Sequence, residues 1–407
     1  MDFSSSIVLI TALLALLAGL AVGKAWERYK LRDGKWIDRR RARQSHHYVL
    51  GLNFLVSNQI DLAIEELSLA TRVDAEALEI HLILGNVHRE RGQVARAIQV
   101  HQSLLQRPKL SKVEHAYVLL CLGLDFKRGG FVDRALESFN EVLKMDPDNQ
   151  YAMLYLQKLH EEQHQWAEAH RIRQRLVELS GPDTQPRNQA ILGFLENALG
   201  VEAIASGDGA QAARHFEAAI DLDAATTPAF LNLGDVRLAQ GDLKGAEAAW
   251  NRLMARSPER AYLAFERLER LYDQMGTPDR FEERCQRLIA ANAQDWRARL
   301  AIGRHLAKRQ KVSEAFEYLL AALEHNPHGL TVHQAVWSVL LELDLNRALM
   351  QRYIESARSA VFFLDPHVCL KCHYRSTELL WQCPHCHEWN TFVEERIAPA
   401  KEATGEM

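Results

Sequence analysis

Apolar and polar residues alternate along most of the chain at a helical spacing, and the pattern recurs with a usual step of 34 residues. In each clear copy an apolar residue precedes a glycine, and an alanine follows that glycine after twelve residues. Several copies also place an aromatic residue four positions after the alanine. The pattern predicts two helices per unit, which cross where the small residues stand. The pairs are Gly51 and Ala63, Gly85 and Ala97, Gly123 and Ala135, Gly200 and Ala212, Gly234 and Ala246, and Gly303 and Ala315.

This period, with small residues at these places, is the tetratricopeptide pattern. We expect each glycine where the two helices of a unit approach closely, and the larger residue, such as Phe139 or Trp250, to pack against the next unit. About nine units are readable over residues 44–363, which predicts an all-α solenoid. Such arrays bind proteins or peptides along one long face. The candidates for that face are Asn86, Arg89, Asn232 and Asp235.

An uncharged, apolar segment stands at the beginning of the sequence, between Asp2 and Lys24. Its 21 residues would span roughly 30 Å as a helix, which is enough to cross one bilayer. Nine lysines and arginines follow within residues 24–43, whereas a cleaved signal peptide carries its positive charge ahead of the apolar segment. By the positive-inside rule, residues 1–23 are predicted to be a single transmembrane anchor, with the rest of the chain in the cytoplasm. A stripe of small residues predicts a helix–helix contact in the membrane: Ala15, Gly19 and Gly23.

The net charge of −4 conceals an acidic body behind the basic segment, and this argues against a nucleic-acid binder. The stretch HEEQH, residues 160–164, matches the H-E-x-x-H pattern of zinc peptidases. Alignment of the repeats, however, places His164 in the turn between two helices, where His160 and His164 cannot share one helix face. Because the sequence also lacks a P-loop, a G-x-S-x-G motif and a dinucleotide-binding motif, we predict that the chain is not an enzyme.

Four cysteines near the end of the sequence form two Cys-x-x-Cys pairs, with ten residues between the pairs. In a cytoplasmic protein this pattern indicates a metal site rather than disulfides. Four sulfur ligands fill a tetrahedral shell and leave no open position for catalysis, so the predicted site is structural. Zinc is favoured, redox-active iron is the alternative, and Tyr374, Trp381, Trp389 and Phe392 are expected to pack around the metal. The predicted ligands are Cys369, Cys372, Cys383 and Cys386.

Together, the anchor, the repeats and a rubredoxin-like four-cysteine tail resemble the lipopolysaccharide assembly protein B family of Gram-negative bacteria. The resemblance is most specific in residues 48–67, 79–105, 131–143 and 381–389. It implies an inner-membrane protein that faces the cytoplasm, with the four cysteines as metal ligands and the tail packed against the repeats. It also implies that the protein presents the committed-step deacetylase of lipid A synthesis (LpxC-type) to an FtsH-type membrane protease. Further implied partners are lipopolysaccharide export proteins and a membrane-embedded regulator.

The leading hypothesis is therefore a membrane-anchored adaptor that regulates lipopolysaccharide synthesis through proteolysis. Two alternatives stay open: a scaffold or chaperone that couples synthesis to export without proteolysis, and a redox or metal enzyme that uses the tail. The predicted domains are an anchor (1–23), a basic juxtamembrane segment (24–43), the repeat array (44–363), a rubredoxin-like metal-binding domain (366–395) and a flexible tail (396–407).

Overall fold

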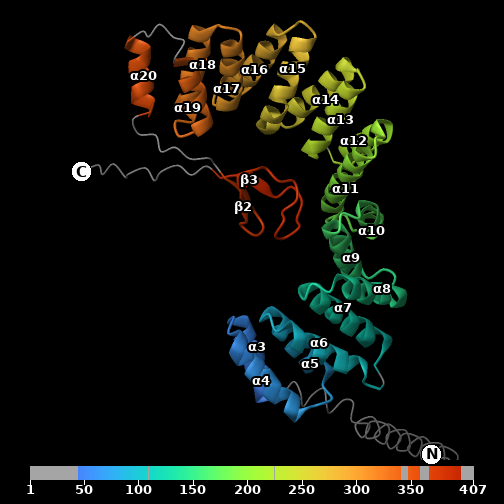
Figure 1. Ribbon diagram of the computed structural model, residues 1–407. Helices are drawn as coiled ribbons and strands as arrows, with labels where there is room; N and C mark the ends of the chain where they lie inside the picture. The colour runs from blue at the N-terminus through green and yellow to red at the C-terminus, as the bar shows by residue number, and fades with distance from the viewer. Residues whose placement is uncertain (1–44, 109, 224, 341–346, 358–365, 396–407) are drawn as a thin grey trace, which may run out of the picture. The chain divides into compact units, whose positions relative to one another are not determined.

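The chain is seen here as a computed structural model that describes residues 45–108, 110–223, 225–340, 347–357 and 366–395 (Figure 1). The predicted anchor, with Ala15, Gly19 and Gly23, and the basic segment behind it lie outside these ranges. Within the described ranges, no helix is both long enough and apolar enough to span a bilayer.

Before the last cysteines, the described chain is a succession of helices joined by short turns, as the repeat pattern predicts. The all-α tetratricopeptide prediction is thereby confirmed for the described residues. The helices are α3 (His46–Val56), α4 (Ile60–Val73), α5 (Leu78–Glu90), α6 (Val94–Leu105), α7 (Lys112–Arg128), α8 (Val132–Met145), α9 (Gln150–Glu162), α10 (Trp166–Glu178), α11 (Gln185–Ala205), α12 (Gly209–Leu222), α13 (Thr227–Ala239), α14 (Leu243–Arg256), the 3-10 helix η1 (Pro258–Ala264), α15 (Phe265–Gln274), α16 (Asp279–Ala291), α17 (Trp296–Lys308), α18 (Val312–His325), α19 (Leu330–Leu340) and α20 (Arg347–Ala357).

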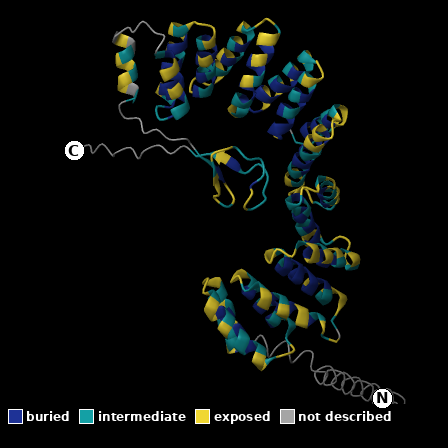
Figure 2. Ribbon diagram, viewed as in Figure 1, coloured by how far each residue is buried: buried dark blue, intermediate teal, exposed yellow. Residues whose placement is uncertain are grey.

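The helices divide into two compact units, and the division lies in α9, between Leu159 and His160. In the first unit, Leu67, Ile80 and their apolar neighbours form the core of the opening helix pairs. In the second unit, a continuous core runs from Ala203 to Val339. Helix α13 contributes residues to this core along most of its length, and Figure 2 shows it largely buried.

The glycines of the repeat pattern lie directly beneath large side chains of the second helix in each pair. A Cβ atom at Gly123 would lie 2.6 Å from the Phe139 ring, and one at Gly234 would lie 2.1 Å from the Trp250 indole. Close approach at the glycines is therefore confirmed. The expectation for the large residue was incomplete, because Phe139 packs on the glycine of its own pair as well as stacking on Tyr155 of the following helix, with ring centroids 5.6 Å apart.

The turns within helix pairs require a residue with positive φ, which glycine adopts without strain. Gly130 (φ 76°) and Gly241 (φ 80°) meet this requirement. In other pairs a non-glycine residue takes the same left-handed conformation, as Asn58 (φ 56°) and His164 (φ 56°) do. These turns end one helix and let the next run back against it.

A small antiparallel sheet follows the helices, and we call residues 367–394 the four-cysteine domain. Its strands are arranged in the order β2-β1-β3. Val368 in the central strand pairs with Arg375 on one side and with Val393 on the other. The strands are β1 (His367–Cys369), β2 (Arg375–Ser376) and β3 (Phe392–Glu394).

Candidate metal centre

Two similar turns bring the four cysteines together. In the first turn the His373 N–H donates to the Cys369 carbonyl at 2.9 Å, and in the second the His387 N–H donates to the Cys383 carbonyl at the same distance. Each histidine follows the second cysteine of its pair. His373 and His387 have φ values of 60° and 55°, so both adopt the left-handed conformation that the turn requires.

The four sulfur atoms lie within 4.8 Å of one another. The Sγ atoms of Cys369 and Cys386 are 3.7 Å apart, and those of Cys372 and Cys383 are 3.6 Å apart. Four sulfurs bound tetrahedrally to zinc at about 2.3 Å would be separated by about 3.8 Å, so the donor set fits one such ion. These distances are too long for disulfide bonds, and all four cysteines are free thiols.

One of the four thiols has a local environment that favours the thiolate, which is the form that binds metal. Burial of Cys369 opposes ionisation, but the Thr391 hydroxyl and the backbone N–H groups of Lys371 and Cys372 lower its pKa to about 6. The Thr391 Oγ1 atom lies 3.1 Å from the sulfur, and its hydroxyl can donate to the thiolate. Cys369 is thus prepared to bind a cation as a charged ligand.

The aromatic residues expected around the metal divide into two groups. Phe392 is buried with Cys369 and Cys383, as expected. Tyr374 packs edge-on against Phe392 and is partly exposed. Trp389 and Trp381, by contrast, pack against the repeats. The prediction that all four aromatic rings pack around the metal is therefore wrong for the two tryptophans. The repeats offer them a larger apolar surface than the small sheet does.

Within the second unit, the four-cysteine domain contacts the repeats through residues that flank the second cysteine pair. The Trp389 indole stacks on Phe194 of α11, with ring centroids 5.4 Å apart, and meets Trp166 of α10 edge-on. The Arg260 guanidinium of η1 lies over the Trp381 ring at 5.7 Å. These ring contacts hold the second cysteine turn against α10, α11 and η1.

Polar contacts surround these rings. They join Glu161 with Gln382 (2.8 Å), Glu162 with His387 (3.5 Å), Arg187 with Glu388 (3.0 Å), Arg260 with Asn390 (3.0 Å), and Arg297 with Glu394. In each pair, a residue of the repeats contacts a residue whose position depends on the fold of the four-cysteine domain. Loss of that fold should weaken the whole set of contacts together.

The HEEQH stretch is part of this contact surface and not a zinc peptidase site. Helix α9 ends at Glu162, and His164 occupies the left-handed turn that follows. The His160 ring bonds with the Gln165 side chain at 2.6 Å. The two histidines therefore do not share a helix face, as predicted, while Glu161 and Glu162 contact the four-cysteine domain.

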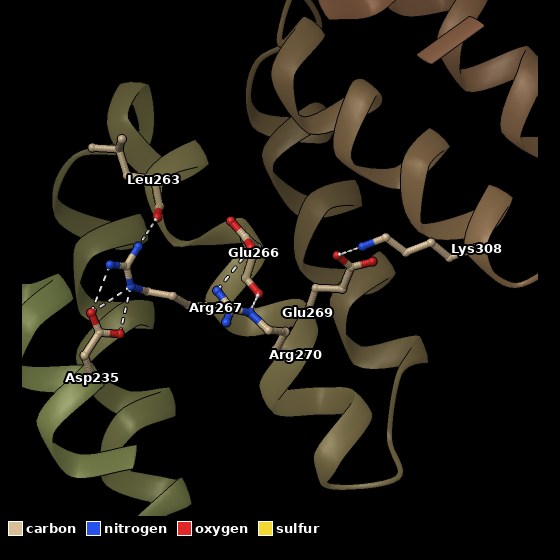
Figure 3. Close-up of polar contacts among 7 residues, drawn as sticks. All are labelled: Asp235, Leu263, Glu266, Arg267, Glu269, Arg270 and Lys308. Atoms are coloured by element: carbon tan, nitrogen blue, oxygen red, sulfur yellow. Dashed lines mark hydrogen bonds and ion pairs between the residues drawn. The ribbon is translucent and has the colours of Figure 1, made fainter. Parts of the chain in front are cut away.

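The four residues proposed for the binding face lie on the first helices of their pairs. Arg89 donates to Asp125 at 2.9 Å, Asn232 donates to Asn197 at 2.9 Å, and both carboxylate oxygens of Asp235 accept from Arg267. Figure 3 shows the contact between Asp235 and Arg267. The side chain of Asn86 lies beside Cys121. Three of the four thus join neighbouring first helices, and their role in partner binding stays a prediction.

Sequence reasoning did not identify the array residues that contact the four-cysteine domain. Trp166 and Phe194 looked like ordinary repeat residues, and Arg187, Arg260 and Arg297 carry no motif. The paired carboxylates of HEEQH were the one local signal, and they pointed to another chemistry. All of these contacts join residues at least 97 positions apart, and no local sequence pattern can indicate such a contact.

Comparison with known families matches both parts of the chain. Residues 367–394 match the model described as rubredoxin metal binding domain. Residues 48–109, 121–180, 203–269 and 270–329 match tetratricopeptide repeat models.

Two curated relatives extend the match over most of the chain. Lipopolysaccharide assembly protein B of Escherichia coli (strain K12) is 29% identical over 356 residues, which are 86% of this chain and 89% of the relative. The Haemophilus influenzae protein of the same name is 23% identical over 390 residues, or 93% of this chain and 97% of the relative. These relatives confirm the resemblance. A crystal structure of MamA protein is 18% identical, with a TM-score of 0.34, over 46% of this chain and 95% of MamA, which is too distant to support an argument.

Proposed function

Since this chain is a tetratricopeptide-repeat protein with a rubredoxin-type four-cysteine domain and resembles lipopolysaccharide assembly protein B along most of its length, we propose that it is a non-enzymatic adaptor in lipopolysaccharide assembly. In this role it brings the committed-step deacetylase of lipid A synthesis to an FtsH-type membrane protease. Residues 1–23 tether it to the inner membrane, with the repeats in the cytoplasm. The tether raises the effective concentration of the client beside the protease without any new contact.

The observation that carries the adaptor proposal is the attachment of the four-cysteine domain to the repeats. Trp389 packs on Phe194, and five polar pairs surround this contact. Four sulfur donors leave no open position on the metal for catalysis. The metal centre and its contacts with the repeats therefore favour a structural role, in which they shape a docking surface. We propose one zinc ion as its occupant, held by Cys369, Cys372, Cys383 and Cys386. If the purified protein is red and contains stoichiometric iron, the bound metal is iron and the zinc proposal is wrong.

The proposed function is tested by the lifetime of the deacetylase in cells that are depleted of this protein. We expect the half-life of the deacetylase to lengthen several-fold on depletion and to return to normal when the full chain is restored. An unchanged half-life combined with failing lipopolysaccharide transport would show that the protein instead serves as a scaffold for export.

A further inference from the structure

A cavity of about 660 Å³ lies between the four-cysteine domain and the last repeats of the second unit. Helices α15 and α17 and the beginning of α19 line one side, and His367, Thr377 and Glu394 line the other. All of these residues belong to one compact unit. The volume falls within the range of sites that hold a small ligand or a short peptide segment.

One part of the cavity lining is aromatic. Tyr262, Phe265, Phe281 and Trp296 contribute their rings from η1 and from helices α15, α16 and α17. Rings of this kind bind an apolar side chain by burying its surface, and they lose little conformational entropy because they are already packed in the core. The lining therefore suits a ligand with at least one apolar group.

The acidic side chains of the lining already have cationic partners. Figure 3 shows two of these contacts, between Glu266 and Arg270 and between Glu269 and Lys308. The carboxylates therefore compete little for a further cation. The complete pairs are Glu266 with Arg270 (3.1 Å), Glu269 with Lys308 (2.6 Å) and with His305 (2.9 Å), and Glu394 with Arg297.

By contrast, Arg304 and Asn326 are donors of the lining that have no carboxylate partner among the described residues. The Arg304 guanidinium donates to the Thr331 carbonyl at 3.2 Å, and no carboxylate of the described residues lies within ion-pairing distance of it. Glu269 acts on Arg304 only electrostatically, since its oxygens already accept from His305 and Lys308. Asn326 is 7% exposed, and its Nδ2 atom finds no acceptor within the described part of the chain.

We propose that this cavity binds a short extended segment of a partner protein, one that carries an Asp or Glu side chain beside an apolar side chain. The carboxylate accepts hydrogen bonds from Arg304 and Asn326, and the apolar side chain packs on the aromatic lining. A charge-assisted bond to guanidinium satisfies the unpaired cation and gives the site its preference for acidic segments. The inference rests on the proposed adaptor function, and it supplies the chemistry of one docking segment.

The test uses purified full-length protein and no protease, so it can fail without affecting the result for deacetylase lifetime. The probe is a fluorescein-labelled pool of hexapeptides with Asp or Glu at positions two and five, Leu or Phe at positions three and four, and mixed residues at the ends. A matched pool carries Asn and Gln in place of the acids. We expect fluorescence polarisation to show micromolar binding of the acidic pool and binding at least about tenfold weaker for the amide pool.

Three variants complete the experiment. Arg304→Ala should weaken binding of the acidic pool about tenfold, while Arg299→Ala, on the same helix but outside the cavity lining, should leave it unchanged. Equal binding of the two pools, no effect of Arg304→Ala, or no binding at all would overturn the proposal. A third variant, which stops at Glu395, tests whether the chain's own last residues occupy the cavity in place of a partner segment. If the acidic pool binds only after residues 396–407 are removed, the chain's own tail fills the cavity and the proposal is wrong.

Discussion

At the scale of single residues, Gly123 shows how a missing side chain sets the distance between two helices. The Phe139 ring occupies the space that a Cβ atom would need, 2.6 Å away. The same relation holds at Gly200 with Phe216, at 2.5 Å. Since protein interiors are packed at crystal density, neither ring can withdraw without disturbing the following helix.

We therefore predict that Gly123→Val lowers the free energy of unfolding by about 1–3 kcal/mol, because the added methyl groups force the helix pair apart. Gly181→Val is the matched control, since a Cβ there would meet no atom within 4 Å. Urea unfolding followed by circular dichroism measures both. Equal midpoints for the two variants would show that the crossing at Gly123 is not tightly packed.

A second residue-scale prediction concerns Trp389, which connects the metal centre to the repeats through Phe194. Trp389→Ala removes the stacked pair and should detach the four-cysteine domain without altering the sulfur cluster. We expect stoichiometric metal to be retained, while limited proteolysis between the repeats and residue 367 becomes about tenfold faster. Tyr374→Ala, which removes a partly exposed ring of the same domain, should change the cleavage rate little.

At the scale of elements, Glu196 joins three consecutive helices of the second unit. Its carboxylate accepts from His170 of α10 and from His215 of α12, each at 2.7 Å. Burial opposes the charge, but the hydrogen bonds from both histidines hold the pKa of Glu196 below its ordinary value. A lowered carboxyl pKa stabilises the fold above the unfolded pKa, and that stability is lost as the pH falls through the folded pKa.

Glu196→Gln should therefore reduce stability near pH 7 by about 1 kcal/mol, after allowance for solvent screening. The difference between the natural protein and the variant should shrink as the pH falls below the ordinary glutamate pKa of about 4.3 and then through the lower pKa of folded Glu196, because the carboxylate becomes protonated over that range. Urea unfolding at a series of pH values measures the difference. A gap that stays constant down to pH 3 would mean that the carboxylate charge contributes nothing.

The metal centre is also an element whose stability can be tested separately. Cys369→Ser combined with Cys372→Ser removes half of the sulfur donors, so bound metal should be lost and residues 367–394 should unfold. The repeats have their own apolar core, from Ala203 to Val339, and should keep their helical signal. Metal analysis with circular dichroism checks both expectations. If this variant retained one zinc ion per chain, the metal would be bound at another site.

At the scale of the whole molecule, the sequence predicts the features that repeat locally. The spacing of Gly123, Ala135 and Phe139 indicates a helix pair, and the spacing of the cysteines indicates a metal-binding turn. Both structures form among residues that are close in the sequence. The docking of Trp389 on Phe194 was not predictable in this way. Its partners are almost 200 residues apart, and a tryptophan beside a metal site can pack either on that site or on another part of the protein.

As the proposed adaptor, the protein brings the deacetylase to the protease, and a reconstituted degradation assay measures this delivery. The deacetylase and the FtsH-type protease are placed with lipid vesicles, and the rate of deacetylase loss is measured with and without the full chain. We predict that the full chain raises this rate at least about tenfold, and that the Cys369→Ser, Cys372→Ser variant does not. A rate that is the same with and without the full chain would show that the protein does not deliver the deacetylase to the protease.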